Sequence, residues 1–277
     1  MIYVNGDSFT AGTGLSDHEF VPDFVKYTLD NISIYDYYQV RRKALTHSEE
    51  SYKIRNKELS WPARMGKILG TEVINAGEGG SSMSSILYRT LLDLTKLQME
   101  GITPERVIIM PTSANRISLI QTDNAMNSNP SEVLNTNRPW IQSVVLGNVE
   151  TNPFIEPFIK ETILIQPESA LTIKWLLEIA LIKNVVNSLI GQHPIIVIPE
   201  FIITHIKSQL KMLNVINNPE FSELISASDI LNIDSTLLMH PINCLPDRHY
   251  DNESHEVFAH KVAKYIQTLN NKEKIYE

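Results

Sequence analysis

The stretch IYVNGDSFT, residues 2–10, joins a strand-like run to a sharp polar turn. Residues 2–4 carry the aliphatic and aromatic side chains of a short buried strand, and the NGD that follows consists of turn-forming residues. Ser8 comes directly after this turn. We therefore expect its hydroxyl to project from the end of a core strand.

Strand-like runs of this kind recur along the chain and alternate with helix-like segments. Short apolar runs predict further strands at 72–75, 106–110 and 194–198. Apolar spacing and capping residues predict helices at 61–69, 84–99, 168–189 and 252–269. This alternation is typical of a parallel sheet with helices on both faces, a doubly wound α/β fold. Ligands bind such sheets at the carboxyl ends of the strands.

We expect residues 1–277 to form a single domain, because this length suits one large α/β domain. Two segments interrupt the alternation and are interpreted as insertions. Residues 16–58 are polar, aromatic and charged, and favour an insertion or lid with a helix near 36–57. Residues 121–166 are rich in Asn, Pro and Ser and have no clear periodicity. A short strand is a further candidate at 230–233.

Composition excludes several classes of protein. The net charge is −8, from 32 acidic and 24 basic residues, which argues against a nucleic-acid partner. No apolar run is long enough to span a membrane. The lone Cys244 cannot form an intrachain disulfide, and we interpret it as a buried or bystander thiol. Because residues 1–4 resemble a core strand, we expect no signal peptide and a cytoplasmic location, or a virion-associated one for a phage-encoded chain.

Polar residues that could carry chemistry lie in the turns after the first three strands and just before the final helix. A serine hydrolase needs a hydroxyl, a base, a group that orients the base, and donors for an oxyanion. Ser8 offers the hydroxyl, and His249 and Asp247 offer the base and its orienting acid. Gly80 can present its backbone N–H closely, and Asn115 offers a side-chain amide.

These blocks resemble the SGNH, or GDSL-like, serine hydrolases. The first block is GDSFT at 6–10, and the second is Asn75-x-Gly77-x-x-Gly80. Asn115 corresponds to the third block, and His249, with His255 and Ala259 after it, corresponds to the last. The resemblance implies a flavodoxin-like three-layer α/β/α sheet. It also implies an oxyanion hole made by the Ser8 N–H, the Gly80 N–H and the Asn115 side chain.

The chain departs from the family pattern in its third and last blocks. The third block usually reads Gly-x-Asn-Asp, but here it is SANR at 113–116, so Arg116 stands where the family has an acid. The catalytic acid usually lies three residues before the His, where this chain has Pro246, and Asp247 lies two before. The segment SWP at 60–62, with Arg89 further on, is similar to SGNH-like proteins of large tailed bacteriophages.

Each candidate residue also has a structural interpretation. Ser8 could cap the helix that follows it, and Asn115 could be a turn residue only. For Asp7 we favour hydrogen bonds to the backbone of the turn over catalysis. Arg116 could bind an anionic group of the substrate or form a surface ion pair. The GEGG loop at 77–80 lacks the Lys-Ser/Thr of a phosphate loop.

The other histidines are weaker candidates for the base. His255 is the main rival of His249, but it should fall within the final helix. His240 precedes a proline and has no acid beside it in the sequence. His18 lies between two acids, but the spacing matches no metal-ligand motif, and we expect no metal and no organic cofactor.

Two functions remain open from the sequence. The first is an esterase that removes a small acyl group, acetyl in the simplest case, from a carbohydrate. The second is a catalytically degenerate structural or carbohydrate-binding component, for example of a phage virion, whose insertions contact other subunits in a homo-oligomer or virion. Two departures motivate this second function: Arg116 stands where the family has an acid, and the glycine of the third block is missing.

Overall fold

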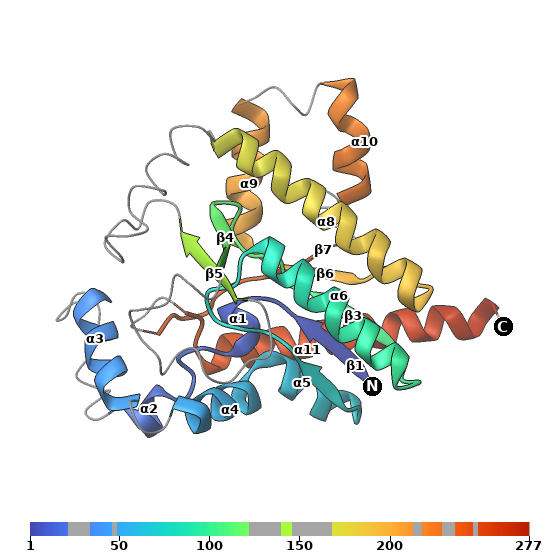
Figure 1. The fold of residues 1–277 in the computed structure, drawn as a ribbon. Coiled ribbons are helices and arrows are strands. Elements are labelled where there is room, and N and C mark those ends of the chain that lie inside the picture. The colour runs from blue at the N-terminus through green and yellow to red at the C-terminus, as the bar shows by residue number, and fades with distance from the viewer. Residues whose placement is uncertain are drawn as a thin grey trace.

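The computed structural model describes residues 1–21, 34–45, 49–121, 140–145, 168–212, 218–228, 236–245 and 249–276. Its centre is a five-stranded, fully parallel sheet in the order β2-β1-β3-β6-β7 (Figure 1). The strands are β1 (Ile2–Asn5), β2 (Val73–Asn75), β3 (Arg106–Ile109), β6 (Ile195–Pro199) and β7 (Thr236–Met239). With the first strand between the second and the third, this is the flavodoxin-like doubly wound order. The predicted three-layer α/β/α fold class is confirmed.

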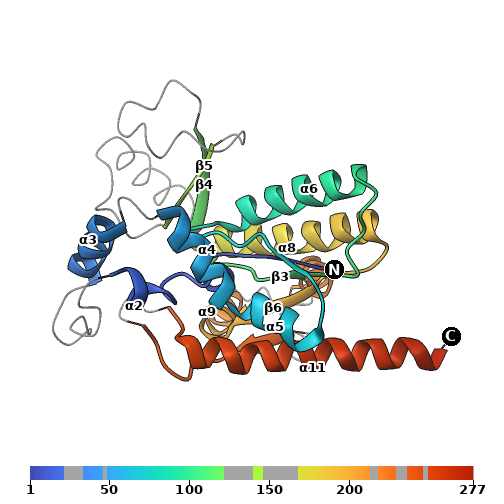
Figure 2. The same ribbon diagram turned by 90° about the horizontal axis from the view of Figure 1, so that it is seen from below.

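Helices cover both faces of the sheet. On one face lie α5 (Trp61–Leu69) and α11 (Asn252–Tyr276), and on the other lie α6 (Met83–Met99) and α8 (Glu168–Ile190) (Figures 1 and 2). Two more helices, α9 (Glu200–Met212) and α10 (Pro219–Ser228), connect β6 to β7 and pack with α8. Among the described residues, no helix combines the length and the apolar character needed to cross a membrane.

Each central strand is buried on both sides, because its side chains alternate between two hydrophobic clusters. In β3 and the residue after it, Val107 and Ile109 join the cluster under α6 and α8. Ile108 and Met110 join the cluster under α5 and α11. This alternation has the period of two that a strand requires, and it makes the whole run apolar.

Local signals fix the ends of the helices beside the sheet. Pro62 lies in the first turn of α5, and Gly70 ends that helix in the left-handed conformation at φ 62°. Ser82 caps α6 by accepting a hydrogen bond from the backbone N–H of Ser85. α5 starts at the predicted residue, and α6 starts one residue before the predicted position.

The described parts of the 16–58 segment, predicted as an insertion or lid, are largely helical and are joined by a buried polar network. The segment contains α2 (Asp17–Phe20), α3 (Ile34–Leu45) and α4 (Glu49–Leu59), so the single helix expected near 36–57 is wrong. The buried Asp17 carboxylate accepts hydrogen bonds from Tyr37 and, at 2.6 Å, from Tyr52. This network joins α2, α3 and α4.

Two strands outside the main sheet were not predicted. β4 (Arg116–Gln121) and β5 (Trp140–Val145) pair antiparallel in a small second sheet. The rest of the proposed 121–166 insertion lies outside the described residues, as does the strand proposed at 230–233. The last strand of the main sheet is β7.

Candidate active site

Ser8 is the first residue of the short helix α1 (Ser8–Ala11), directly after β1. The cap of this helix is Asp7, whose side chain accepts from the Phe9 N–H, so the interpretation of Ser8 as the cap is wrong. A side chain at Gly6 would collide with Thr10 and with Met110, which is why this turn needs glycine. Ser8 is 4% exposed, and its hydroxyl has no hydrogen-bond partner among the described residues.

Asp7 is a buried structural carboxylate, as the sequence predicts. Besides the N–H of Phe9 at 3.1 Å, it accepts a hydrogen bond from the Thr112 hydroxyl at 2.9 Å. The guanidinium of Arg116 lies 3.4 Å from the same carboxylate oxygen, Oδ2. Asp7 therefore joins the turn after β1 to the turn after β3.

The loop after β2 packs closely against α1. A side chain at Gly77 would collide with Thr10 and with the backbone of Ala11. Gly80 is exposed, and its φ of 78° lies in the left-handed region that favours glycine. The backbone N–H of Glu78 donates to the Gly6 carbonyl at 3.2 Å, which ties this loop to the Ser8 turn.

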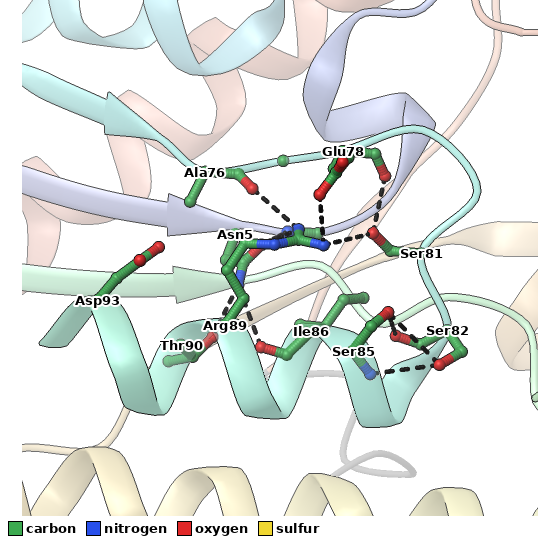
Figure 3. Close-up of polar contacts among 12 residues, drawn as sticks. Asn5, Ala76, Glu78, Ser81, Ser82, Ser85, Ile86, Arg89, Thr90 and Asp93 are labelled. Atoms are coloured by element: carbon green, nitrogen blue, oxygen red, sulfur yellow. Dashed lines mark hydrogen bonds and ion pairs between the residues drawn. The ribbon is translucent and has the colours of Figure 1, made fainter. Parts of the chain in front are cut away.

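A buried arginine on α6 holds the same loop from its other side (Figure 3). The Arg89 guanidinium donates to the Ala76 carbonyl at 3.0 Å and to the Ser81 hydroxyl at 3.0 Å, on either side of the tip. It also donates to the Asn5 side chain at 3.1 Å and forms an ion pair with Glu78 at 2.8 Å. One side chain thus links the end of β1, the loop after β2, and α6.

Arg116 brings together the neighbours of all three proposed oxyanion donors. Its Nη1 lies 3.4 Å from Asp7, which precedes Ser8, and 3.4 Å from the carbonyl of Ser81, which follows Gly80. Arg116 itself follows Asn115 in the chain. Its side chain is only 19% exposed, so a surface ion pair is the wrong description. The three predicted turns therefore converge at one edge of the sheet.

Asn115 is half-buried in the turn before β4. Its Oδ1 accepts a hydrogen bond from the Ser113 hydroxyl. No hydrogen bond from its Nδ2 is found within the described part of the chain. In this orientation the amide N–H groups are available to an oxyanion.

His249 lies against the residue that follows Ser8. The imidazole ring packs on Phe9 with ring centroids 5.3 Å apart. Its carbonyl accepts from the Leu245 N–H at 2.7 Å, beside an antiparallel bridge between Cys244 and Tyr250. The Ser8 hydroxyl makes no hydrogen bond to His249 or to any other described residue, and such a contact is often long until substrate binds. Asp247 lies outside the described residues.

His255 is held in a structural role in α11. It is 1% exposed, and its Nδ1 accepts a hydrogen bond from the Trp61 N–H at 3.0 Å. Burial, with smaller contributions from Arg64 and His249, lowers the pKa of His255 to about 3. This histidine is neutral near pH 7 and joins α11 to α5.

The remaining candidate residues are Cys244, His240 and His18. Cys244, expected as a buried or a bystander thiol, is exposed, so the first of these alternatives is wrong. His240 does have an acid beside it in space, because its Nδ1 lies 2.8 Å from Glu200 Oε2. His18 is exposed beside Glu19, and no cluster that could hold a metal ion is found among the described residues.

Sequence reasoning missed the contacts that hold the site together. Phe9 lies at the centre of a ring cluster with Phe201, His249 and Tyr250. Burial first, then the charges of Cys244, Glu200 and Asp7, raise the pKa of Tyr250, so it remains a neutral phenol. In the sequence, these contacts are indicated only by the aromatic Phe9 after Ser8 and by Arg89 within the predicted helix at 84–99.

No protein-family model matches the sequence, and neither does any curated protein. Among solved structures, the chain is similar to a family two carbohydrate esterase from Clostridium thermocellum in complex with cellohexaose, at 10% identity and TM-score 0.47. It is also similar to an acetyl xylan esterase from Butyrivibrio proteoclasticus, at 11% identity and TM-score 0.45. The alignments cover 98% and 100% of this chain, which spans 64% of the length of each esterase.

A third similar structure is a lipolytic protein of the G-D-S-L family from Desulfitobacterium hafniense. Its identity is 15% and its TM-score 0.38, with 95% of this chain and 97% of that chain covered. The solved structures to which this chain is similar thus include carbohydrate esterases and G-D-S-L lipolytic proteins.

Proposed function

We propose that the chain is a serine esterase that removes a small acyl group, acetyl in the simplest case, from a carbohydrate. Ser8 is the nucleophile in this proposal, His249 is the base, and Asp247 orients the base. The oxyanion hole consists of the Ser8 N–H, the Gly80 N–H and the Asn115 Nδ2.

The state of the Ser8 hydroxyl is the observation that carries the proposal. It is buried at the carboxyl end of a central strand and has no hydrogen-bond partner among the described residues. Buried hydroxyl groups are nearly always paired, and unpaired ones call for an explanation such as catalysis. The position of the His249 ring on the adjacent Phe9 also supports the proposal.

The reaction proceeds in two steps. His249 takes the proton of the Ser8 hydroxyl as Oγ attacks the ester carbonyl, and the oxyanion that forms accepts the three proposed N–H donors. Collapse of this intermediate breaks the ester bond, and His249 gives its proton to the leaving alcohol. Water then attacks the acyl-serine with His249 as base, which releases the acid and restores Ser8.

The polar character of the proposed insertions favours a small acyl group on a polar carrier over a long lipid chain. The Arg116 substitution does not leave an unbalanced charge, because its guanidinium faces the buried Asp7 carboxylate. This observation weakens the motive for a degenerate site.

The test is hydrolysis of p-nitrophenyl acetate by the wild type, Ser8→Ala and His249→Ala. We expect kcat/KM to fall about 10³-fold or more in each variant, since the nucleophile and its base act as a unit. The matched controls are Ser222→Ala and His260→Ala, which remove an exposed serine on α10 and an exposed histidine on α11.

Labelling by a fluorophosphonate provides a second readout. We expect the wild type to be labelled at Ser8 and the Ser8→Ala protein to remain unlabelled. Absence of both turnover and labelling in the wild type would reject the esterase proposal and favour the non-catalytic alternative.

A further inference from the structure

A second group of polar and aromatic side chains lies beside the Ser8 turn and takes no part in the proposed triad. It consists of Glu200 and Phe201, which follow β6, and His240, which follows β7. Because β6 and β7 are parallel neighbours, these residues share the carboxyl edge of the sheet with Ser8.

The ring of Phe9 connects this group to the proposed active site. Phe201 packs on Phe9 with ring centroids 5.9 Å apart, and His249 packs on the same ring at 5.3 Å. Phe201 is nevertheless 51% exposed. An apolar ring face is therefore open to solvent one side chain away from His249.

Glu200 and His240 form a polar pair with a defined chemistry. The imidazole Nδ1 lies 2.8 Å from the carboxylate Oε2, and both side chains are about half exposed. With its proton on Nδ1, the imidazole presents Nε2 as a hydrogen-bond acceptor, and the second oxygen of Glu200 is another acceptor. Two acceptors side by side suit a ligand that carries neighbouring hydroxyl donors.

We propose that Glu200, Phe201 and His240 form the subsite that binds the carrier of the acyl group, and that this carrier is a neutral, polyhydroxylated ring. The hydroxyl groups of the ring donate to the Glu200–His240 pair, and its C–H face packs on Phe201. An exposed carboxylate in the subsite disfavours an anionic sugar. This inference rests on the proposed function for the role of the carrier, but binding of the ring can be measured without turnover.

The experiment measures binding of xylohexaose by calorimetry to the wild type, Glu200→Gln, Phe201→Ala and His240→Ala. We expect the affinity to fall about three- to tenfold in each variant, the loss typical of one hydrogen bond or one packed ring. The controls are His260→Ala, which breaks an exposed His–Glu pair on α11, and Leu177→Ala, which truncates an exposed apolar side chain on α8. Circular dichroism checks that each variant is folded.

A comparison with an anionic ligand tests the charge of the carrier. We expect hexagalacturonate to bind the wild type more weakly than xylohexaose does, and the difference to shrink in Glu200→Gln. Wild-type affinity for xylohexaose in all three variants, or an equal loss in His260→Ala, would overturn the subsite.

Turnover separates this inference from the proposed function. On O-acetylated xylohexaose, the ratio of kcat/KM to that for p-nitrophenyl acetate should fall in the three subsite variants and stay constant in the controls. If the wild type binds xylohexaose through these residues but hydrolyses neither ester, the esterase proposal fails and the subsite stands. If hydrolysis is intact and the ratio does not change, the subsite fails alone.

Discussion

The Ser8 hydroxyl is kept in a buried position where it contributes nothing to the stability of the fold. A buried hydroxyl without a hydrogen bond costs about 1–3 kcal/mol relative to one in water. We therefore expect Ser8→Ala to raise the free energy of unfolding by about 1 kcal/mol, measured by urea denaturation. Thr10→Val is the matched comparison, because the buried Thr10 hydroxyl also has no partner among the described residues. A clear loss of stability in Ser8→Ala would show that its hydroxyl is bonded in solution.

His255 should make stability depend on pH. Its pKa of about 3 in the folded protein lies below the usual value of about 6.5, so between these values the unfolded chain binds a proton that the folded chain does not. The contribution of His255 is therefore complete above about pH 6.5 and is lost as the pH falls through this window.

Urea denaturation at pH 7.5 and pH 5.5 tests this expectation. The wild type should lose about 1 kcal/mol more between these values than His255→Asn, whose amide oxygen can still accept from the Trp61 N–H. Equal losses in the two proteins would mean that His255 titrates normally in the fold.

At the scale of single residues, the sequence predicts which side chains lie close together but not the contacts that hold them in place. Ser8, Gly80 and Asn115 follow successive strands, and parallel strands bring their carboxyl ends to one edge. The contacts of Arg89 with Asn5 and of Arg116 with Asp7 join residues more than 80 positions apart. No local pattern encodes such contacts, so their roles emerge only from the fold.

At the scale of elements, Arg89 fixes the position of the loop between β2 and α6. Four acceptors, one in β1 and three in this loop, bond to this one guanidinium, so its planar geometry sets the distance between the Ser8 turn and Gly80 (Figure 3). Lysine retains the charge but cannot reach all of these acceptors at once. Arg89 is therefore a positioning residue for the oxyanion hole that we propose.

We expect Arg89→Lys to lower kcat for p-nitrophenyl acetate by about 10²-fold, the effect of losing one oxyanion donor, with little change in KM. Glu78→Gln should have a small effect, because the Glu78 carboxylate is 65% exposed and the other three contacts of Arg89 remain. Added guanidinium ions should restore part of the activity of Arg89→Ala. A folded Arg89→Lys protein with wild-type kcat would contradict the positioning role.

The sequence predicts four strands of the main sheet closely, but it does not predict β7, and it predicts the peripheral elements poorly. The strands predicted at 72–75, 106–110 and 194–198 correspond to β2, β3 and β6, respectively, and their ends agree to within one residue. Their apolar runs reflect burial on two faces, which is a strong signal. By contrast, β4 and β5 form only through each other across an intervening segment, and α3 and α4 contact a buried Asp17 that no spacing reveals.

At the scale of the whole molecule, two hydrophobic clusters share one sheet. Trp61 belongs to the cluster under α5 and α11, and Trp175 belongs to the cluster under α6 and α8. If the helices on one face came away, the strands that also pack against the helices of the other face would be exposed to water. We therefore expect both clusters to unfold in one cooperative transition.

Tryptophan fluorescence can follow each cluster separately. In Trp140→Phe/Trp175→Phe the signal comes from Trp61, and in Trp61→Phe/Trp140→Phe it comes from Trp175. Within each protein, the denaturation midpoint by fluorescence should equal the midpoint by far-ultraviolet circular dichroism. Two separate midpoints in either protein would show that one side of the sheet melts by itself.

The alternation of strands and helices was sufficient to predict this layered arrangement, because each element must bury an apolar face against another layer. The order β2-β1-β3-β6-β7 agrees with right-handed crossovers, but the handedness rule alone does not select it from the other doubly wound orders. How the 16–58 and 121–166 segments relate to the layers does not follow from these rules, since their described residues contribute no strand to the main sheet.

A ribosome releases α11 only after every strand of the main sheet. Until then the sheet face formed by Ile2, Val4 and Ile108 lacks the helix whose Phe258 and Val262 cover it. At ordinary rates of translation, roughly 10–30 s separate the synthesis of β3 from that of α11. During this interval the nascent chain carries a bare apolar surface, which makes it a client for chaperones that hold such surfaces.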